Sequence, residues 1–142
     1  MICRWIDGKM PSLADFESRE FLYKLSFKLK ELHSLECKKV FNPFFDIKER
    51  LKLCINLNLP LPSSIDILIN KLDLLENKLI KTQLLGLCHN DLNSSNILLN
   101  KENLYFVDFE YSCMGDVFFD LAAISWFFTE NSRRELLFQY FG

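Results

Sequence analysis

Glycine is scarce in this chain, which has four glycines in 142 residues. They are spread along the sequence between Gly8 and Gly142, so no segment matches the Gly-rich loops whose backbone N–H groups cradle phosphates. The scarcity of glycine therefore excludes a phosphate-binding loop of that kind within these residues.

Long apolar runs and targeting signals are also missing. The longest apolar tract, residues 117–128, contains Asp120 and is too short to cross a bilayer. The first seven residues include Arg4 and Asp7, where a secretory signal peptide has its apolar region. We therefore expect no membrane insertion and a cytoplasmic location.

The sequence also lacks paired cysteines and a large excess of one charge. The five cysteines form no CxxC pair and their number is odd, which favours free thiols in a reducing compartment over a zinc site. The net charge is −2 and no block of Lys or Arg occurs, so no nucleic-acid or membrane-surface partner is expected.

The residues that are present are typical of one globular domain. Hydrophobic residues make up 49% of the chain and charged residues 25%, which is enough to bury a core. The abundance of Phe and Leu, together with the few glycines, favours helix-rich packing.

Apolar periodicity predicts several helices. The leucines between Leu22 and Leu32 recur at helical spacing, in a helix expected to begin near Ser12, which has capping-box-like spacing to Asp15. Residues 65–79 carry an apolar stripe that predicts an amphipathic core helix. Further helices are expected after the Asn42-Pro43 break, from Asp116 onward, and over residues 132–140.

A polar loop lies between two apolar runs and holds His89, Asp91 and Asn96 in the pattern H-x-D-x-x-x-x-N. Residues 97–99 and 104–107 then predict a short hairpin, and Asp108 and Glu110 follow its second strand. Phosphoryl transfer needs a carboxylate to position the acceptor hydroxyl, and further oxygen ligands to hold Mg²⁺ on the phosphates. Asn, Asp and Ser are also common in capped turns, so the loop by itself would indicate only a loop.

Three motifs carry a resemblance to a known family: His89-Asn-Asp, Asp108-Phe-Glu-Tyr-Ser112 and Phe119-Asp-Leu-Ala122. They resemble the aminoglycoside phosphotransferase/choline kinase superfamily, which shares its fold with protein kinases, and within it the bacterial choline kinase branch. The resemblance implies an α+β, mainly helical fold, with a small hairpin that carries the catalytic and metal loops. It also implies that residues 1–142 form a C-terminal lobe and that the N-terminal ATP-binding lobe is absent from them.

The same resemblance implies roles for individual residues. Asp91 would orient the acceptor hydroxyl and His89 would brace the loop. Asn96, Asp108 and, less strongly, Glu110 would hold Mg²⁺ with ATP as the phosphoryl donor. Two residues are expected to be structural: Asp120, which in the family bonds the catalytic loop from beneath and could also cap a helix, and His33, for which a structural role is favoured over a catalytic one.

The acceptor is the least specified part of this reading. Tyr111, Trp126 and Phe127 offer aromatic faces for a quaternary ammonium group, although each could equally be a core residue. Choline or a related amino alcohol is implied by the resemblance, with ethanolamine, thiamine or an aminoglycoside as alternatives. Only eleven residues separate Asp108 from Asp120, too few for the activation segment of a protein kinase.

A different class of function also fits the sequence, namely a catalytically silent remnant or binding module that keeps the fold of the lobe. In either case we expect the interface toward the missing lobe to leave an apolar patch near Ile2, Trp5 and Leu98. Such a patch would favour self-association.

Overall fold

The structure is a computed structural model that describes residues 5–101 and 103–142, and its regular elements are mainly helical. The helices of this part of the chain are α1 (Arg19–His33), α2 (Pro43–Asn56), α3 (Ile65–Leu79), α4 (Phe118–Ser125) and α5 (Glu130–Phe141), with 3₁₀ turns η1 (Asp15–Glu17) and η2 (Ser94–Asn96). Its strands are β1 (Leu85–Cys88), β2 (Ile97–Asn100), β3 (Asn103–Phe106) and β4 (Cys113–Asp116).

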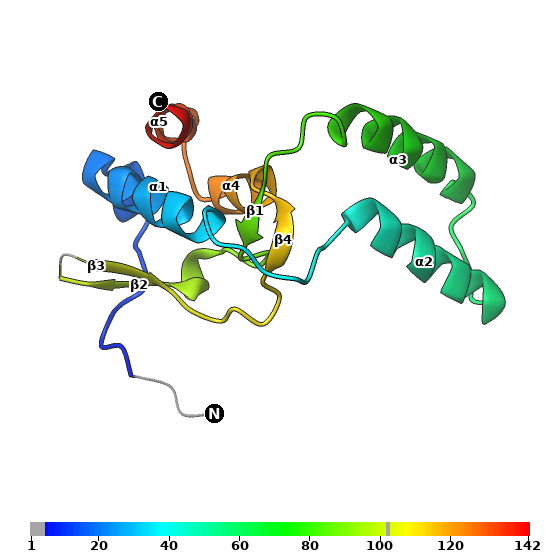
Figure 1. The fold of residues 1–142 in the computed structure, drawn as a ribbon, viewed down its shortest axis with the longest axis horizontal. Coiled ribbons are helices and arrows are strands. Elements are labelled where there is room, and N and C mark those ends of the chain that lie inside the picture. The colour runs from blue at the N-terminus through cyan, green and yellow to red at the C-terminus, as the bar shows by residue number, and fades with distance from the viewer. Residues whose placement is uncertain (1–4, 102) are drawn as a thin grey trace.

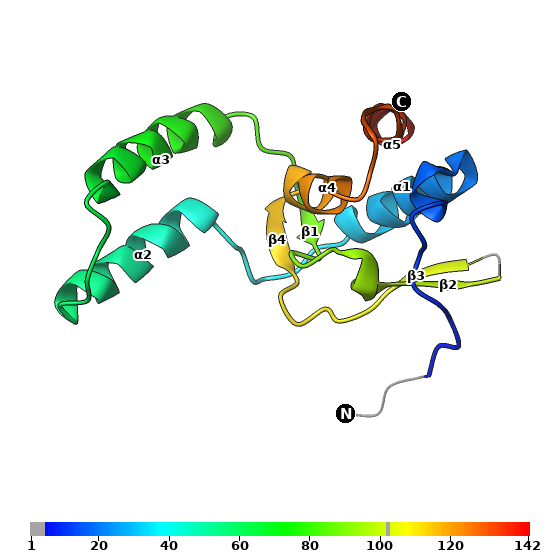
Figure 2. The same ribbon diagram turned by 180° about the vertical axis from the view of Figure 1, so that it is seen from behind.

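These elements form a body and a projecting helical hairpin (Figure 1). The body contains α1, α4, α5 and both sheets, whereas α2 and α3 extend together to one side of it. The view from behind gives the same arrangement (Figure 2). The mainly helical α+β fold expected from the sequence is therefore confirmed.

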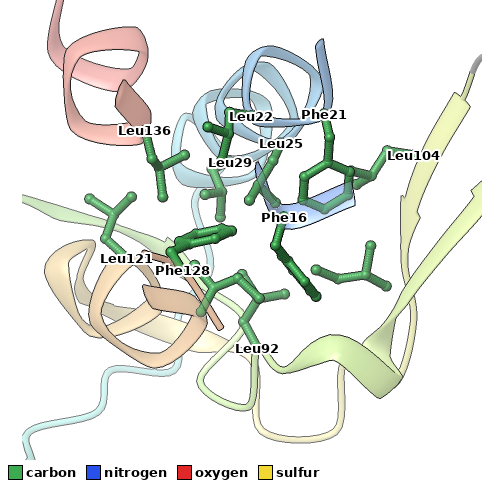
Figure 3. Packing of buried hydrophobic residues seen from close by; sticks show 12 residues of the cluster. Phe16, Phe21, Leu22, Leu25, Leu29, Leu92, Leu104, Leu121, Phe128 and Leu136 are labelled. Carbon is green, nitrogen blue, oxygen red and sulfur yellow. The ribbon is translucent and has the colours of Figure 1, made fainter. Parts of the chain in front are cut away.

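The core lies between α1 and the helices at the end of the chain. Leu25 and Leu29 are fully buried, as the helical spacing of the leucines predicts, and Ile124 of α4 is equally buried opposite them. Figure 3 shows these helices and η1 contributing side chains to one cluster. Burying a Leu or Ile side chain of this kind stabilises the fold by about 1.5–3 kcal/mol.

The long first helix begins later than the sequence indicated. Ser12 and Asp15 do form reciprocal capping bonds, with the Ser12 amide donating to Asp15 at 2.7 Å and the Asp15 amide donating to Ser12 Oγ at 3.4 Å. These bonds close the turn that leads into η1, and α1 starts only at Arg19 with Ser18 as its N-cap. The prediction of one continuous helix was wrong because a second capping residue interrupts it.

The prediction of a core helix over residues 65–79 was correct in extent and wrong in environment. α3 has no buried residue, and leucines of its apolar stripe such as Leu68 and Leu75 are about half exposed. α3 instead faces α2, to which Lys48 ties it through an ion pair with Asp73 at 2.7 Å. The apolar stripe is therefore covered only in part within the described chain.

The two sheets are each two-stranded and antiparallel. β2 pairs with β3 as the sequence predicts, with Ile97 opposite Phe106. β1 pairs with β4, with Cys88 opposite Cys113, and this sheet was not predicted. Four-residue strands are too short to show a clear alternation, and β4 has a glycine at its centre. The β1–β4 pair places the segment after Cys88 beside the segment before Cys113.

The first described residues run along the hairpin without forming a strand of their own. Lys9 exchanges backbone hydrogen bonds with Leu99 at 2.8 and 2.9 Å. Of the expected apolar patch, Trp5 is 87% exposed and Leu98 is half-buried, while Ile2 lies outside the described residues. Self-association through this patch stays a prediction.

Two further expectations concern thiols and membranes. Cys88 and Cys113 are buried free thiols, Cys54 is partly buried and Cys37 is exposed. Among residues 5–101 and 103–142, every helix is too short or too polar to cross a membrane.

Candidate active site

The polar loop between β1 and η2 is held from below by Asp120, which lies in the first turn of α4 and is fully buried. Its Oδ2 accepts a hydrogen bond from the His89 amide at 2.6 Å, and its Oδ1 accepts one from the Asn90 amide at 2.9 Å. A buried carboxylate requires such donors. Asp120 therefore bonds the loop, as the resemblance implied, rather than capping its own helix.

His89 ties the same loop to the end of β3. Its ring is fully buried, and Nε2 donates to the Val107 carbonyl at 2.8 Å. A carbonyl oxygen only accepts, so the proton of a neutral His89 is on Nε2. The ring also lies against Phe109, with ring centroids 4.8 Å apart. These contacts are those of a bracing residue.

Asn90 is a supporting residue that the sequence reasoning missed. It adopts a left-handed backbone conformation with φ 63°, and its side-chain amide donates to the Tyr111 carbonyl at 3.1 Å and to Cys113 Sγ at 3.0 Å. Asn tolerates this conformation better than most residues, which is the sequence signal that could have identified it. Asn90 thereby joins the loop to the segment that follows Asp108.

Asp91 and Asn96 lie together, as the motif predicts. Asn96 is buried, and its Nδ2 donates to the Asp91 carbonyl at 2.8 Å and to Asp91 Oδ2 at 3.1 Å. Asp91 itself is exposed. With its amide nitrogen facing Asp91, Asn96 has its Oδ1 free to accept a donor or to ligate a cation. The carboxylate of Asp91 is thus held at the surface by a buried side chain.

Asp108 lies two residues after the end of β3, next to a residue that bonds to Asn96. The Val107 amide donates to the Asn96 carbonyl at 3.0 Å, which puts Asp108 one residue beyond a bond to Asn96. Asp108 is exposed and has φ 66°, a conformation that costs most L-residues roughly 1–2 kcal/mol and Asp less. Glu110 is also exposed, two residues farther on.

The aromatic residues proposed for the acceptor are placed in three different settings. Tyr111 is 57% exposed, and its carbonyl is bonded to the loop through Asn90. Phe127 stacks on Phe16 in the core, with centroids 5.4 Å apart, and Trp126 is 84% exposed at the end of α4. Of these three aromatic residues, Tyr111 is the one that these contacts connect to the loop.

A cavity of about 640 Å³ lies where the helical hairpin joins the body, and Asn90 forms part of its wall. Its other walls come from the start of α2, the end of α3, β4 and the start of α4. They include the side chains Phe41, Phe44, Phe118, Phe119 and Asp116. The sequence reasoning missed this cavity because it unites segments that are about 75 residues apart.

Two buried groups complete the underside of the loop. His33 ends α1, and its Nε2 lies 3.2 Å from Asp120 Oδ2, so its side chain has the structural position favoured from the sequence. Cys88 precedes the loop, and burial, followed by the charge of Asp120, raises the pKa of its thiol to about 12. At neutral pH Cys88 is therefore a protonated thiol, unsuited to nucleophilic chemistry.

Known proteins resemble this chain in sequence and in structure. Probable choline kinase 2 of Arabidopsis thaliana is 30% identical over 128 residues, covering 83% of this chain and 36% of the plant protein. A LicA homolog of Mycoplasma capricolum is 28% identical over 138 residues, covering 97% of this chain and 55% of that protein. The crystal structure of a choline/ethanolamine kinase family protein from Mesorhizobium loti matches with a TM-score of 0.79 at 28% identity, over 98% of this chain and 50% of that one.

The chain therefore spans between 36% and 55% of the length of these relatives. A family model described as the phosphotransferase enzyme family matches residues 1–141. The resemblance drawn from the three motifs is confirmed, and so is the kinase-like fold of a partial lobe. The chain belongs to the phosphotransferase enzyme family.

Proposed function

We propose that this chain is the acceptor-binding and catalytic lobe of a kinase that transfers the γ-phosphoryl group of ATP to the hydroxyl of a small molecule. The observation that carries the proposal is the pairing of an exposed Asp91 with a buried Asn96, beside the segment that presents Asp108. The activity belongs to the whole protein, and the relatives are longer than the chain. We infer that nucleotide contacts beyond these residues complete the site.

In this proposal Asp91 accepts the hydrogen bond of the acceptor hydroxyl and orients its oxygen toward the phosphorus. The transition state of phosphoryl transfer is loose, so orientation contributes more than strong basicity. Asn96 keeps the carboxylate of Asp91 in one position through its Nδ2 bond of 3.1 Å. His89 and Asp120 hold the loop backbone and do not touch the reacting atoms.

The residues present fit a divalent cation of the Mg²⁺ type. Asn96 offers an amide oxygen because its nitrogen is committed to Asp91, and Asp108 offers an exposed carboxylate, with Glu110 as a further candidate. Mg²⁺ prefers oxygen ligands and needs only one or two protein carboxylates besides phosphates and water. When bound, such an ion would neutralise charge on the phosphates.

Choline or a related amino alcohol is the acceptor that we propose. The cavity beside Asn90 joins aromatic walls to the carboxylate of Asp116, a combination that favours an organic cation. Tyr111 can contribute a further aromatic face at the loop. The names of the relatives support choline or ethanolamine as the acceptor. We also propose that the reaction takes place in the cytoplasm, where free thiols persist.

The test uses a joined protein, a single polypeptide in which a nucleotide-binding N-terminal lobe precedes residues 1–142. Asp91→Ala should remove nearly all turnover of choline and leave nucleotide affinity largely intact, because positioning of the acceptor is lost. Asp108→Ala should abolish Mg²⁺-dependent nucleotide binding as well. Steady-state kinetics and calorimetric titration with Mg²⁺–ATP measure the two effects.

Asp66→Asn is the matched control, because Asp66 is an exposed carboxylate in the first turn of α3. It should change neither quantity. Equal and modest losses in the Asp91 and Asp108 variants would show that the roles are misassigned. Nucleotide binding without turnover of choline, ethanolamine, thiamine or an aminoglycoside would favour the silent binding module.

A further inference from the structure

Three side chains, the partly buried Tyr140 and the buried His33 and Asp120, lead from α5 to the polar loop. The Tyr140 hydroxyl lies 2.6 Å from His33 Nδ1, and His33 Nε2 lies 3.2 Å from Asp120 Oδ2. The same Asp120 accepts the amides of His89 and Asn90. These hydrogen bonds thus connect α5 to the two residues that precede Asp91.

Elementary hydrogen-bond chemistry fixes the direction of these bonds. An ionised Asp120 only accepts, so His33 Nε2 must carry a proton. In neutral His33, Nδ1 is then an acceptor, and Tyr140 is its donor. In a protonated His33, Nδ1 would donate to the Tyr140 oxygen. A hydroxyl satisfies Nδ1 in both cases, and a phenyl ring satisfies it in neither.

Asp120 accepts a third hydrogen bond, from His33, in addition to the two from the loop amides. Burial makes this bond important. His33 is 8% exposed and Asp120 is fully buried, so most of the surface of both groups is withheld from bulk water. Burial also raises the pKa of Tyr140 to about 12, which keeps its hydroxyl protonated and able to donate at neutral pH. The Tyr140 and His33 rings meet edge to face, with centroids 5.6 Å apart.

We propose that Tyr140 is a positioning residue, which orients His33 so that Asp120 holds the backbone amides of His89 and Asn90 in place. The role concerns the geometry of the loop that carries Asp91. Its consequence for phosphoryl transfer rests on the proposed function, whereas its effect on the loop can be measured without any activity.

A metal ion is the other chemistry that this cluster could suggest. His33, Cys88 and Asp120 offer ligand atoms within 4.8 Å of one another. A transition metal would need the Cys88 thiolate, and burial raises the pKa of that thiol to about 12. Asp120 Oδ2 already accepts the His89 amide at 2.6 Å. The geometry therefore favours the hydrogen-bonded chain over a metal site.

The test uses the 142-residue chain and NMR. In the parent protein, the ¹⁵N shifts of His33 should show a protonated Nε2. Tyr140→Phe should change the ring signals of His33 and speed amide exchange at His89 and Asn90 about tenfold, the effect of one lost buried hydrogen bond. Tyr23→Phe, which alters an exposed tyrosine of α1, should change none of these signals.

Three further variants separate positioning from general loosening of α5. Leu136→Val reduces packing in the same helix and alters none of the hydrogen bonds that join Tyr140, His33 and Asp120. It should leave the His33 signals and the relative exchange rates of His89 and Asn90 unchanged. His33→Gln retains a side-chain N–H donor and should preserve protection of the two amides, whereas His33→Leu should lose it.

Several results would overturn the proposal. One is an unprotonated Nε2 in the parent protein. Another is the same rate of amide exchange at His89 and Asn90 in the Tyr140→Phe and Leu136→Val variants. Displacement of the His33 signals by stoichiometric Zn²⁺ would assign the cluster to a metal instead. Failure of the chain to support kinase activity would leave these measurements unaffected, so the two proposals can fail separately.

Discussion

At the scale of single residues, the site depends on polar groups other than Asp91 itself. Asp120 has no exposed surface and accepts hydrogen bonds from two amides of the loop. Asn90 holds the opposite side of the loop through its side-chain bonds to the Tyr111–Cys113 segment. The exposed carboxylate of Asp91 is therefore positioned by buried polar contacts, which is how preorganised sites avoid reorganisation during reaction.

Gly86 gives a prediction at this scale, because β1 passes very close to the end of α1. A Cβ added at Gly86 would lie 2.5 Å from the His33 carbonyl oxygen and 2.9 Å from Val117 Cγ1. Gly86→Ala should therefore destabilise the fold by about 1–3 kcal/mol through overpacking. The midpoint of urea unfolding measures the change.

Gly115→Ala is the control for that experiment, because Gly115 is the direct partner of Gly86 in the sheet. A Cβ there would meet Cys88 Sγ at 3.7 Å, which is an ordinary contact. We expect little loss of stability. Similar losses in both variants would show that the approach of α1 is not what makes glycine necessary in β1.

At the scale of elements, the hairpin of α2 and α3 depends on local signals more than on the core. Asn42 caps α2 by accepting from the Phe44 amide at 3.0 Å and the Phe45 amide at 3.2 Å. Phe44 is the buried residue of α2, and α3 has none. A helix with so little burial gains a larger share of its stability from its cap.

Asn42→Ala should therefore destabilise α2 by about 0.5–2 kcal/mol, because two amides lose their acceptor. Amide exchange measured residue by residue should rise within α2 and remain unchanged in α1. Ser64→Ala is the matched control, since Ser64 is the N-cap of α3 and makes no side-chain capping bond. An equal response in α3 would contradict the assignment of the cap.

Some features of these elements could be predicted from the sequence, and others could not. Helical spacing predicts the buried face of α1 because Leu25 and Leu29 alternate with polar residues over several turns. It could not reveal that α3 projects, since an apolar stripe does not say what covers it. The motif predicts Asp91, Asn96 and Asp108 because their spacing is local. The bonds of Asp120 to His33 and to the loop span 87 and 31 residues. The resemblance implied the bond to the loop, but no local pattern encodes the bond to His33.

At the scale of the whole molecule, the chain matches about half the length of solved relatives. Asp91 and Asp108 are both exposed in the described part of the chain. Mg²⁺ held by one or two carboxylates stays largely hydrated, so its affinity depends on phosphates that are held from another side. Open access of water also weakens each electrostatic contact.

A polypeptide of these 142 residues should accordingly bind Mg²⁺–ATP weakly and show no turnover of choline. Isothermal titration and a phosphorylation assay measure the two quantities. The joined protein described above is the positive control. Micromolar nucleotide affinity with steady turnover in the 142-residue chain would contradict the interpretation as one lobe.

The buried bonds beneath the loop also bear on the order of events during folding. Asp120 can accept the His89 amide only after residues 31 positions apart have met, and His33 must approach from 87 positions away. Contacts between distant residues form slowly because closing long loops costs entropy. The segment that carries Asp91 should therefore become protected late in refolding, after the local turns of α1 and the β2–β3 hairpin have formed.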